Sequence, residues 1–239
     1  MNHVAVIIPT TNKELEMAEK VKRSVLDSTY QNVNVFIINE GKERSEQRNI
    51  GIDCAVSGGF DYILYLDSDQ IVSRKLIEEC VELMLTGFGA LYIPERIMTP
   101  GLFAKIRNYE RGFYDGTAVD CVRFMKTKNC PKFSLDLNGP EDSHHDRQVK
   151  GIRTITKNVI YHHDGIGFLD YFKKKAYYAK SMRKFSEMNP GDKVLSPWYR
   201  CFWIYVEDGK WKRILRHPLM FLCVIGIVAA RAVIYLRAK

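Results

Sequence analysis

Several features that would assign the chain to a familiar class are missing from its 239 residues. The six cysteines form no Cys-x-x-Cys pair, which argues against a structural zinc site, and we expect reduced, mostly buried thiols of a cytosolic protein. No internal repeat or low-complexity tract is visible. The apolar run at residues 4–8 is too short for a secretory signal peptide and ends at Pro9.

A glycine-rich, basic loop that would hold a triphosphate is also missing. Residues 9–14, which follow the first apolar run, contain no glycine and only one basic residue, Lys13. Nucleotidyltransferases normally carry such a loop early in the chain. Its absence argues against a nucleotidyltransferase, which we keep as an alternative.

The positive charge of the chain is concentrated in its C-terminal third. The formal net charge is +8, but residues 166–239 hold 15 Lys and Arg against 5 Asp and Glu, whereas residues 1–165 hold 21 against 23. A basic tail indicates an anionic surface as its partner. Because apolar residues also run together in this tail, a membrane is favoured, and we expect no nucleic-acid partner.

Short β-branched runs alternate with amphipathic helical patterns over residues 4–93. This alternation predicts an α/β fold with a parallel sheet, whose ligands bind at the carboxyl ends of the strands. The predicted strands cover residues 4–8, 33–39, 62–66 and 90–93, and the predicted helices cover 13–28, 43–56 and 76–85.

Two carboxylates, Asp67 and Asp69, follow the buried run at residues 62–66. A hard divalent cation prefers oxygen ligands and keeps substrate phosphates in its shell, so this pair can hold Mg²⁺ or Mn²⁺ against a diphosphate. An acidic turn that caps the next helix is the alternative, and an Asp-x-Asp pair alone does not separate the two.

Four stretches stand out in chain order: residues 6–12 (VIIPTTN), 48–52 (RNIGI), 66–69 (LDSD) and 139–142 (GPED). They resemble motifs of family 2 glycosyltransferases, which have the GT-A fold. Further matches, at residues 43–49, 93–95, 109–111 and 123–124, resemble a membrane-associated branch of that family. The resemblance covers roughly residues 4–190 and implies a Rossmann-like, mostly parallel sheet flanked by helices.

The resemblance implies roles for residues along the donor. Pro9, Thr10 and Asn12 would line the nucleotide pocket. Glu40 would read the base, although this chain has Asn-Glu-Gly at residues 39–41 in place of the usual Asp-rich loop. Arg48 would face the base or the phosphates.

The resemblance also implies a metal shell. Asp69 would bind the cation directly, and Asp67 would contact the ribose or the metal. A histidine often completes this shell in the family; His162 is our choice and His163 the alternate, while an ordinary loop histidine is the competing interpretation.

Asp142 would be the general base that takes a proton from the acceptor hydroxyl. A single base without a second nucleophile implies direct displacement with inversion. Glu141, in the same motif, would contact substrate. An acidic helix start is the alternative interpretation of both carboxylates, and the two interpretations are compatible. Arg123 is a candidate for phosphate contact or a plain surface charge.

The C-terminal region is predicted to associate with a membrane. A helix over residues 168–188 has an apolar stripe and many lysines, and residues 218–236 are apolar apart from Arg231. This run can span a bilayer, lie on its surface, or be buried in a homodimer. We therefore divide the chain into a catalytic domain, residues 1–165, and a basic membrane-associating region, residues 166–239.

Together these patterns predict a metal-dependent inverting glycosyltransferase. It would transfer a sugar from a UDP- or GDP-type donor to a lipid-linked acceptor. The positive-inside rule assigns residues 210–216 to the cytoplasmic face of the cell membrane. A catalytically inactive, membrane-bound scaffold that binds nucleotide sugars is the other alternative.

Overall fold

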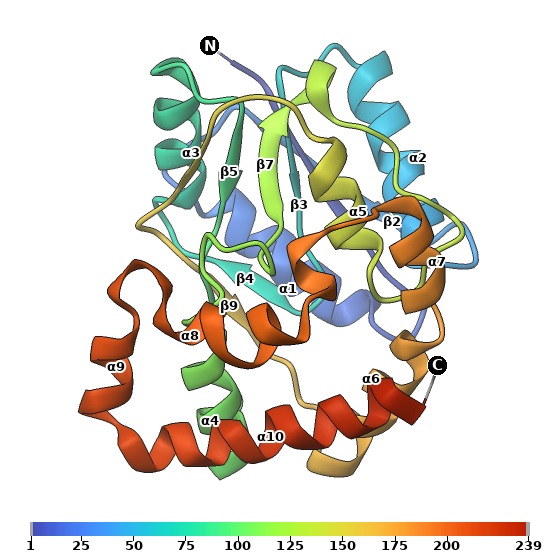
Figure 1. The fold of residues 1–239 in the computed structure, drawn as a ribbon. Coiled ribbons are helices and arrows are strands. Elements are labelled where there is room, and N and C mark those ends of the chain that lie inside the picture. The colour runs from blue at the N-terminus through green and yellow to red at the C-terminus, as the bar shows by residue number, and fades with distance from the viewer. Residues whose placement is uncertain (1, 238–239) are drawn as a thin grey trace.

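Two sheets organise the computed structural model, which describes residues 2–237 (Figure 1). The larger sheet has the strand order β2 (Val33–Ile38), β1 (Val4–Pro9), β3 (Tyr62–Tyr65), β7 (Val122–Lys126), β5 (Ala90–Tyr92) and β8 (Arg153–Ile155). The smaller sheet has the order β4 (Gln70–Val72), β9 (Ile160–His162) and β6 (Glu95–Ile97).

The larger sheet is mixed, with most of its pairs parallel. Strand β1 runs parallel to β2 and to β3, and β5 runs parallel to β8. Strand β7 lies antiparallel between β3 and β5, so the sheet is mostly parallel, as predicted, with one antiparallel strand. The side chains of residues 122–125 are buried. A strand that is buried on both faces has the same continuous apolar pattern whether it pairs parallel or antiparallel with its neighbours, so the sequence does not indicate its direction.

Helices cover both faces of this sheet (Figure 1). Successive residues of β1 point to opposite faces, so Val6 packs with α1 (Leu15–Leu26) and α3 (Leu76–Leu85), while Ile7 packs with α2 (Arg44–Ser57). Helix α5 (Glu141–Gln148) lies on the α2 side, where its His145 contacts Tyr65. The fold therefore has the predicted mixed α/β class with helices flanking a central sheet.

The C-terminal third packs on α4 (Leu102–Arg111) and wraps the lower edge of the molecule in Figure 1. Side chains of α4, α6, α8 and α10 share one apolar core. The remaining elements are η1 (Thr127–Asn129), α6 (Phe168–Ala179), α7 (Met182–Met188), η2 (Lys193–Leu195), η3 (Tyr199–Trp203), α8 (Ile204–Val206), η4 (Glu207–Gly209), α9 (Trp211–Arg216) and α10 (Pro218–Arg237).

Two stretches of the chain are divided by tertiary contacts. The helix expected over residues 168–188 breaks before α7, where the Ser181 hydroxyl accepts a hydrogen bond from the Asn138 amide at 3.2 Å. Residues 154–161, which have a strand-like sequence, are split between β8 and β9, which belong to different sheets. Neither division has a glycine or proline to mark it in the sequence.

The cysteines are free thiols, as expected, but they are not mostly buried. Only Cys80 is buried, whereas Cys201 and Cys223 are exposed. Cys223 lies within the apolar run at residues 218–236, but on the outward face of α10.

Gly51 makes the close approach of α2 to β1 possible. A Cβ atom on this residue would lie 2.4 Å from Cγ2 of Ile7, which is fully buried in the core. We predict that Gly51→Ala lowers the free energy of unfolding by about 1–3 kcal/mol, because the buried neighbour has no free space. Urea denaturation followed by circular dichroism measures this change.

Gly226→Ala on α10 is the matched control. Nothing lies within 4 Å of a Cβ atom at that helical position, so the substitution should be neutral or slightly stabilising. Equal stability of the two variants would contradict the packing argument.

Candidate active site

Arg48 connects the two acidic motifs. Its Nη2 lies 2.9 Å from Oδ1 of Asp67, after β3, and its Nη1 pairs with Oδ1 of Asp142, on α5. The guanidinium also lies 4.9 Å from the ring centroids of Tyr65 and Phe133. Arg48 is fully buried, so α2 carries a positive charge that is matched from both sides.

Asp67 is held by arginines. Besides Arg48, Nη1 of Arg44 lies 3.6 Å from the same carboxylate oxygen. Burial alone would raise the pKa of the Asp67 carboxyl, but Arg44, Arg48 and Arg123 together lower it well below its ordinary value. The carboxylate is therefore directed to the arginines.

Asp69 lies with His162 on the adjacent small sheet. Strands β4 and β9 pair antiparallel with Gln70 opposite His162, so the His162 Nε2 lies 3.2 Å from Oδ2 of Asp69. The other carboxylate oxygen of Asp69 is buried without a hydrogen-bond partner. Of the two histidines considered, His163 is exposed and contributes a backbone amide, which donates to the Asp69 carbonyl at 2.9 Å.

A divalent cation fits Asp69 and His162 only in part. Over residues 2–237, no group of three or more His, Cys, Asp and Glu side chains is arranged to hold a metal. The unpaired oxygen of Asp69 is nevertheless a suitable ligand, and so is an imidazole nitrogen of His162 once the cation has displaced its proton. A cation held there would take its remaining ligands from water or from a bound diphosphate.

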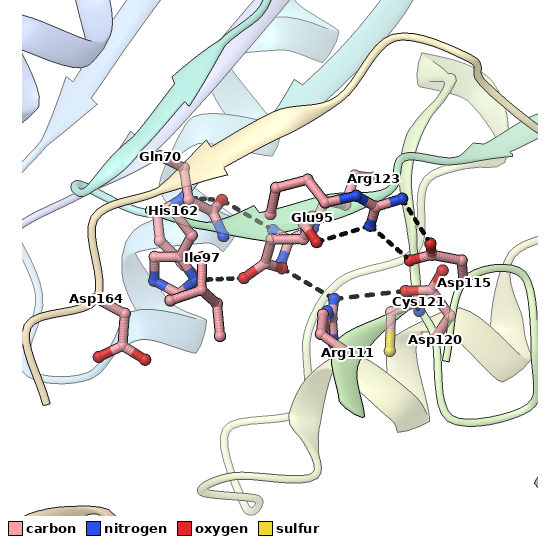
Figure 2. Close-up of polar contacts among 12 residues, drawn as sticks. Gln70, Glu95, Ile97, Arg111, Asp115, Asp120, Cys121, Arg123, His162 and Asp164 are labelled. Carbon is pink, nitrogen blue, oxygen red and sulfur yellow. Dashed lines mark hydrogen bonds and ion pairs between the residues drawn. The ribbon is translucent and has the colours of Figure 1, made fainter. Parts of the chain in front are cut away.

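Glu95 on β6 is a site residue to which sequence analysis gave no role, although it lies in one of the matched stretches. Figure 2 shows it between His162 and two arginines. Its Oε1 contacts Nδ1 of His162, and its Oε2 accepts hydrogen bonds from Arg111 at 2.8 Å and Arg123 at 3.2 Å. Burial opposes protonation of His162, yet hydrogen bonds with Asp69 and Glu95 raise its pKa to about 10.

Arg123 is buried, so the interpretation as a plain surface charge is wrong. Besides Glu95, it donates to Oε1 of Gln70 at 3.2 Å, and the same oxygen accepts the Asp67 amide at 2.8 Å. Arg123 therefore supports the Asp67–Asp69 turn through the side chain of Gln70.

The motif at residues 139–142 forms the start of α5. Gly139 has a φ of +107°, and its amide donates to the Glu141 carboxylate. The ring of Tyr178 on α6 covers this turn, where a Cβ on Gly139 would lie 2.4 Å from its Cγ. Burial and the neighbouring Asp142 raise the pKa of Glu141. Asp142 itself keeps 26% of its side chain exposed, toward a cavity.

The remaining predicted donor residues follow β1 and β2. Pro9 ends β1, and the Thr10 carbonyl accepts a hydrogen bond from Gln47 at 2.8 Å. Asn12 and Glu40 are exposed, and Asn39 beside Glu40 donates to Asn12 Oδ1 at 3.3 Å. The two loops thus meet at the carboxyl edge of the sheet.

His144 and His145 lie apart from Asp69 and His162. The His145 ring stacks on Phe133 at 3.9 Å, and burial lowers its pKa to about 4. His144 hydrogen-bonds Gln148 and Asn189. Both side chains fasten α5 to its surroundings.

The depressed pKa values of Asp67 and Glu95 predict acid sensitivity. Burial alone would raise the pKa of Glu95, but Arg111, His162 and Arg123 lower it. A carboxyl with a lowered folded-state pKa stabilises the fold above its unfolded pKa, about 4, and that stability is lost as the pH falls. We predict that Glu95→Gln reduces the loss of unfolding free energy between pH 6 and pH 3 by on the order of 1–3 kcal/mol.

Urea titrations at the two pH values, with EDTA present, measure this difference. Glu19→Gln on α1 makes the same chemical change at an exposed ion pair with Lys22 and should leave the pH dependence unchanged. An unaltered pH dependence in Glu95→Gln would contradict the role given to the arginines.

Comparison with known proteins agrees with the architecture. No known family and no curated protein matches the sequence. The mannosyltransferase PcManGT from Pyrobaculum calidifontis, solved with GDP-Man and Mn²⁺, is 13% identical with a TM-score of 0.59, over 99% of this chain and 88% of that chain. S. aureus TarS 1-349 with UDP-GlcNAc is 11% identical with a TM-score of 0.51, over 96% of this chain and 81% of that one.

A longer S. aureus TarS structure is 12% identical with a TM-score of 0.52 over 88% of this chain. The present chain spans only 44% of its length. At such low identities the likeness establishes the fold alone, and the chain shares the GT-A architecture of these solved structures.

Proposed function

We propose that the chain transfers a sugar from a nucleoside-diphosphate sugar to an acceptor hydroxyl, with inversion. The observation that carries this proposal is the bridge made by Arg48 between Asp67 and Asp142. It joins a carboxylate on the donor side of the site to one that faces an open cavity. Neighbours with the same fold are solved with GDP-Man and Mn²⁺ or with UDP-GlcNAc, which supports a nucleotide-sugar donor.

On the donor side, Pro9, Thr10, Asn12 and Glu40 would surround the nucleoside. Asp69 and His162 would hold Mg²⁺ or Mn²⁺, which when bound neutralises the charge of the departing diphosphate. Glu95 contacts the other nitrogen of His162 and so fixes the ring orientation. Arg44, whose side chain is 42% exposed beside Asp67, presents a guanidinium group suited to phosphate oxygens, whereas Arg48 stays paired with Asp67 and Asp142.

On the acceptor side, Asp142 would act as the general base. It takes the hydroxyl proton while the acceptor oxygen bonds to the anomeric carbon and the bond to the diphosphate oxygen breaks. Arg48 orients the carboxylate, and Glu141 braces the turn that carries it. One displacement of this kind inverts the anomeric configuration.

The first test removes the base. Asp142→Asn keeps the size of the side chain and should lower turnover roughly a hundredfold or more while donor binding stays intact. A panel of UDP- and GDP-sugars with membranes, analysed by mass, identifies the reaction. Turnover close to that of the unmodified protein would assign the base elsewhere, with Glu141 and Asp146 next.

The second test concerns the cation. Asp69→Ala and excess EDTA should each abolish metal-dependent nucleotide binding, and Glu95→Gln should weaken it roughly 10–100-fold because His162 loses its orienting partner. Calorimetric titration of Mn²⁺ with UDP or GDP measures this. Glu19→Gln is again the matched control. Full activity in EDTA would overturn the metal assignment.

An inactive scaffold and a nucleotidyltransferase remain the competing functions. A scaffold would bind nucleotide sugar without turnover, whereas a nucleotidyltransferase would release pyrophosphate from a nucleoside triphosphate. The donor panel separates these outcomes from glycosyl transfer.

We further propose that residues 166–239 attach the catalytic part, residues 1–165, to the cytoplasmic face of a membrane, with α10 lying on the bilayer. By length and composition α10 can cross a membrane. Its Arg231, however, is buried, pairs with Glu110 on α4 and hydrogen-bonds the Tyr171 hydroxyl at 3.2 Å. Spanning would break this buried pair, which is costly.

The opposite face of α10 is apolar and exposed, as an interfacial helix requires. We predict that the double variant Leu219→Gln, Leu222→Gln moves the chain from the membrane pellet to the supernatant at high salt. These two leucines are 76% and 62% exposed, so the fold should tolerate the change. Leu85→Gln, at a leucine 68% exposed on α3, is the matched control. A variant that still needs detergent for release would contradict the in-plane arrangement.

A further inference from the structure

A cavity of about 500 Å³ extends from the proposed base to the C-terminal helix. Its lining includes Asp142 and Ser143 of α5 as well as Val228, Ala232 and Tyr235 of α10. Asp67, Asp69 and His162 do not line it. The cavity therefore reaches the proposed base without including the proposed metal ligands.

The lining of the cavity combines two kinds of side chain. Apolar side chains, among them Met182, Leu195 and Val228, line it together with arginines, a lysine and two carboxylates. An occupant that matches both kinds of side chain is an amphiphile.

Most charges in this cavity are paired within the protein. Arg111 and Arg123 bind Glu95, and Arg231 binds Glu110. The two carboxylates are also paired: Asp120 lies 3.6 Å from Arg111, and Asp142 binds Arg48.

Lys175 on α6 and Arg200 on η3 differ from these paired residues in having no carboxylate partner among the described residues. Neither forms an ion pair with a carboxylate anywhere in residues 2–237, and both line the cavity. The Lys175 ammonium lies over the rings of Tyr171 and Tyr178, at 5.3 and 5.7 Å. Burial together with the charges of Arg231 and Arg200 lowers the pKa of Lys175 to about 7. An anion placed here would compensate two cations that the protein leaves unmatched.

We propose that this cavity is the acceptor subsite, and that the acceptor carries an anionic group of the phosphate class bound by Lys175 and Arg200, with an apolar chain against α10. This inference rests on the proposed function, because it assigns the hydroxyl beside Asp142 to the same molecule. It makes α10 a wall of the active site as well as a membrane element.

Two cysteines allow a binding test that needs no transfer reaction. Cys201 is exposed and lines the cavity, whereas Cys54 on α2 does not line it. The full chain is alkylated with iodoacetamide and analysed by peptide mass spectrometry. This measures the alkylation rates of Cys201 and Cys54 in the same sample. The probes are decyl phosphate, 1-decanol, which lacks the anion, and methyl phosphate, which lacks the chain.

Decyl phosphate at ten times its dissociation constant should slow alkylation of Cys201 roughly tenfold without changing Cys54. Decanol and methyl phosphate should protect much less at the same concentration. Protection by methyl phosphate alone would mean a site for free anions, and protection by decanol alone would mean a plain apolar pocket; either result overturns the proposal.

Variants identify the groups involved. Lys175→Gln with Arg200→Gln should reduce protection by decyl phosphate to the level of decanol, and Ala232→Phe should reduce it by filling the space beside α10. Lys174→Gln, at an exposed neighbour outside the cavity, should leave it intact. Each variant is compared with its own ligand-free rate, because the substitutions also change the surroundings of Cys201.

Nucleotide binding distinguishes failure of this inference from failure of the proposed function. If metal-dependent UDP or GDP binding persists and decyl phosphate gives no protection, the acceptor subsite is wrong and the transferase proposal stands. If decyl phosphate protects Cys201 but no nucleotide binds, the cavity is an amphiphile site and the transferase proposal fails.

Discussion

The arrangement of the site depends on one buried guanidinium. Arg48 has no contact with water, so its charge requires partners, and it finds them in Asp67 and Asp142. These carboxylates come from the end of β3 and the start of α5, which are distant in the chain. Tyr65 and Phe133 confine the guanidinium between their rings. The position of α2 against the sheet therefore determines where both acidic motifs lie.

A second set of buried ion pairs repeats this principle farther from the sheet. Glu95 joins the small sheet to α4 through Arg111, and Glu110 on the same helix joins it to α10 through Arg231. Helix α4 thus stands between the His162 region and the C-terminal helix, with the guanidinium of Arg111 directed to the first and the carboxylate of Glu110 directed to the second. Such pairs add little net stability but penalise any arrangement that leaves one partner alone. They make the packing of the C-terminal third specific.

The sequence predicted the individual strands and helices better than the contacts between them. The alternating strands and helices through residue 93 were found because buried parallel strands and amphipathic helices each have a distinct period. The antiparallel direction of β7, the small sheet and the division of the 168–188 helix depend on partners far away in the chain. The motifs located Asp67, Asp69 and Asp142, but no local pattern indicates that Arg48 joins two of them across 19 and 94 residues. The separation of Lys175 and Arg200 from every carboxylate is likewise visible only once the chain is folded.

The two faces of α10 affect how the proposed acceptor would reach the site. With its outward face in the bilayer interface and its inward face on the cavity, the helix would bring the mouth of the site into the layer where an amphiphile diffuses. Encounter would then take place in two dimensions, and the relevant acceptor concentration would be its mole fraction among the surrounding lipids. Dilution of the membranes in buffer would leave that quantity unchanged, whereas dilution of the acceptor with inert lipid would lower it.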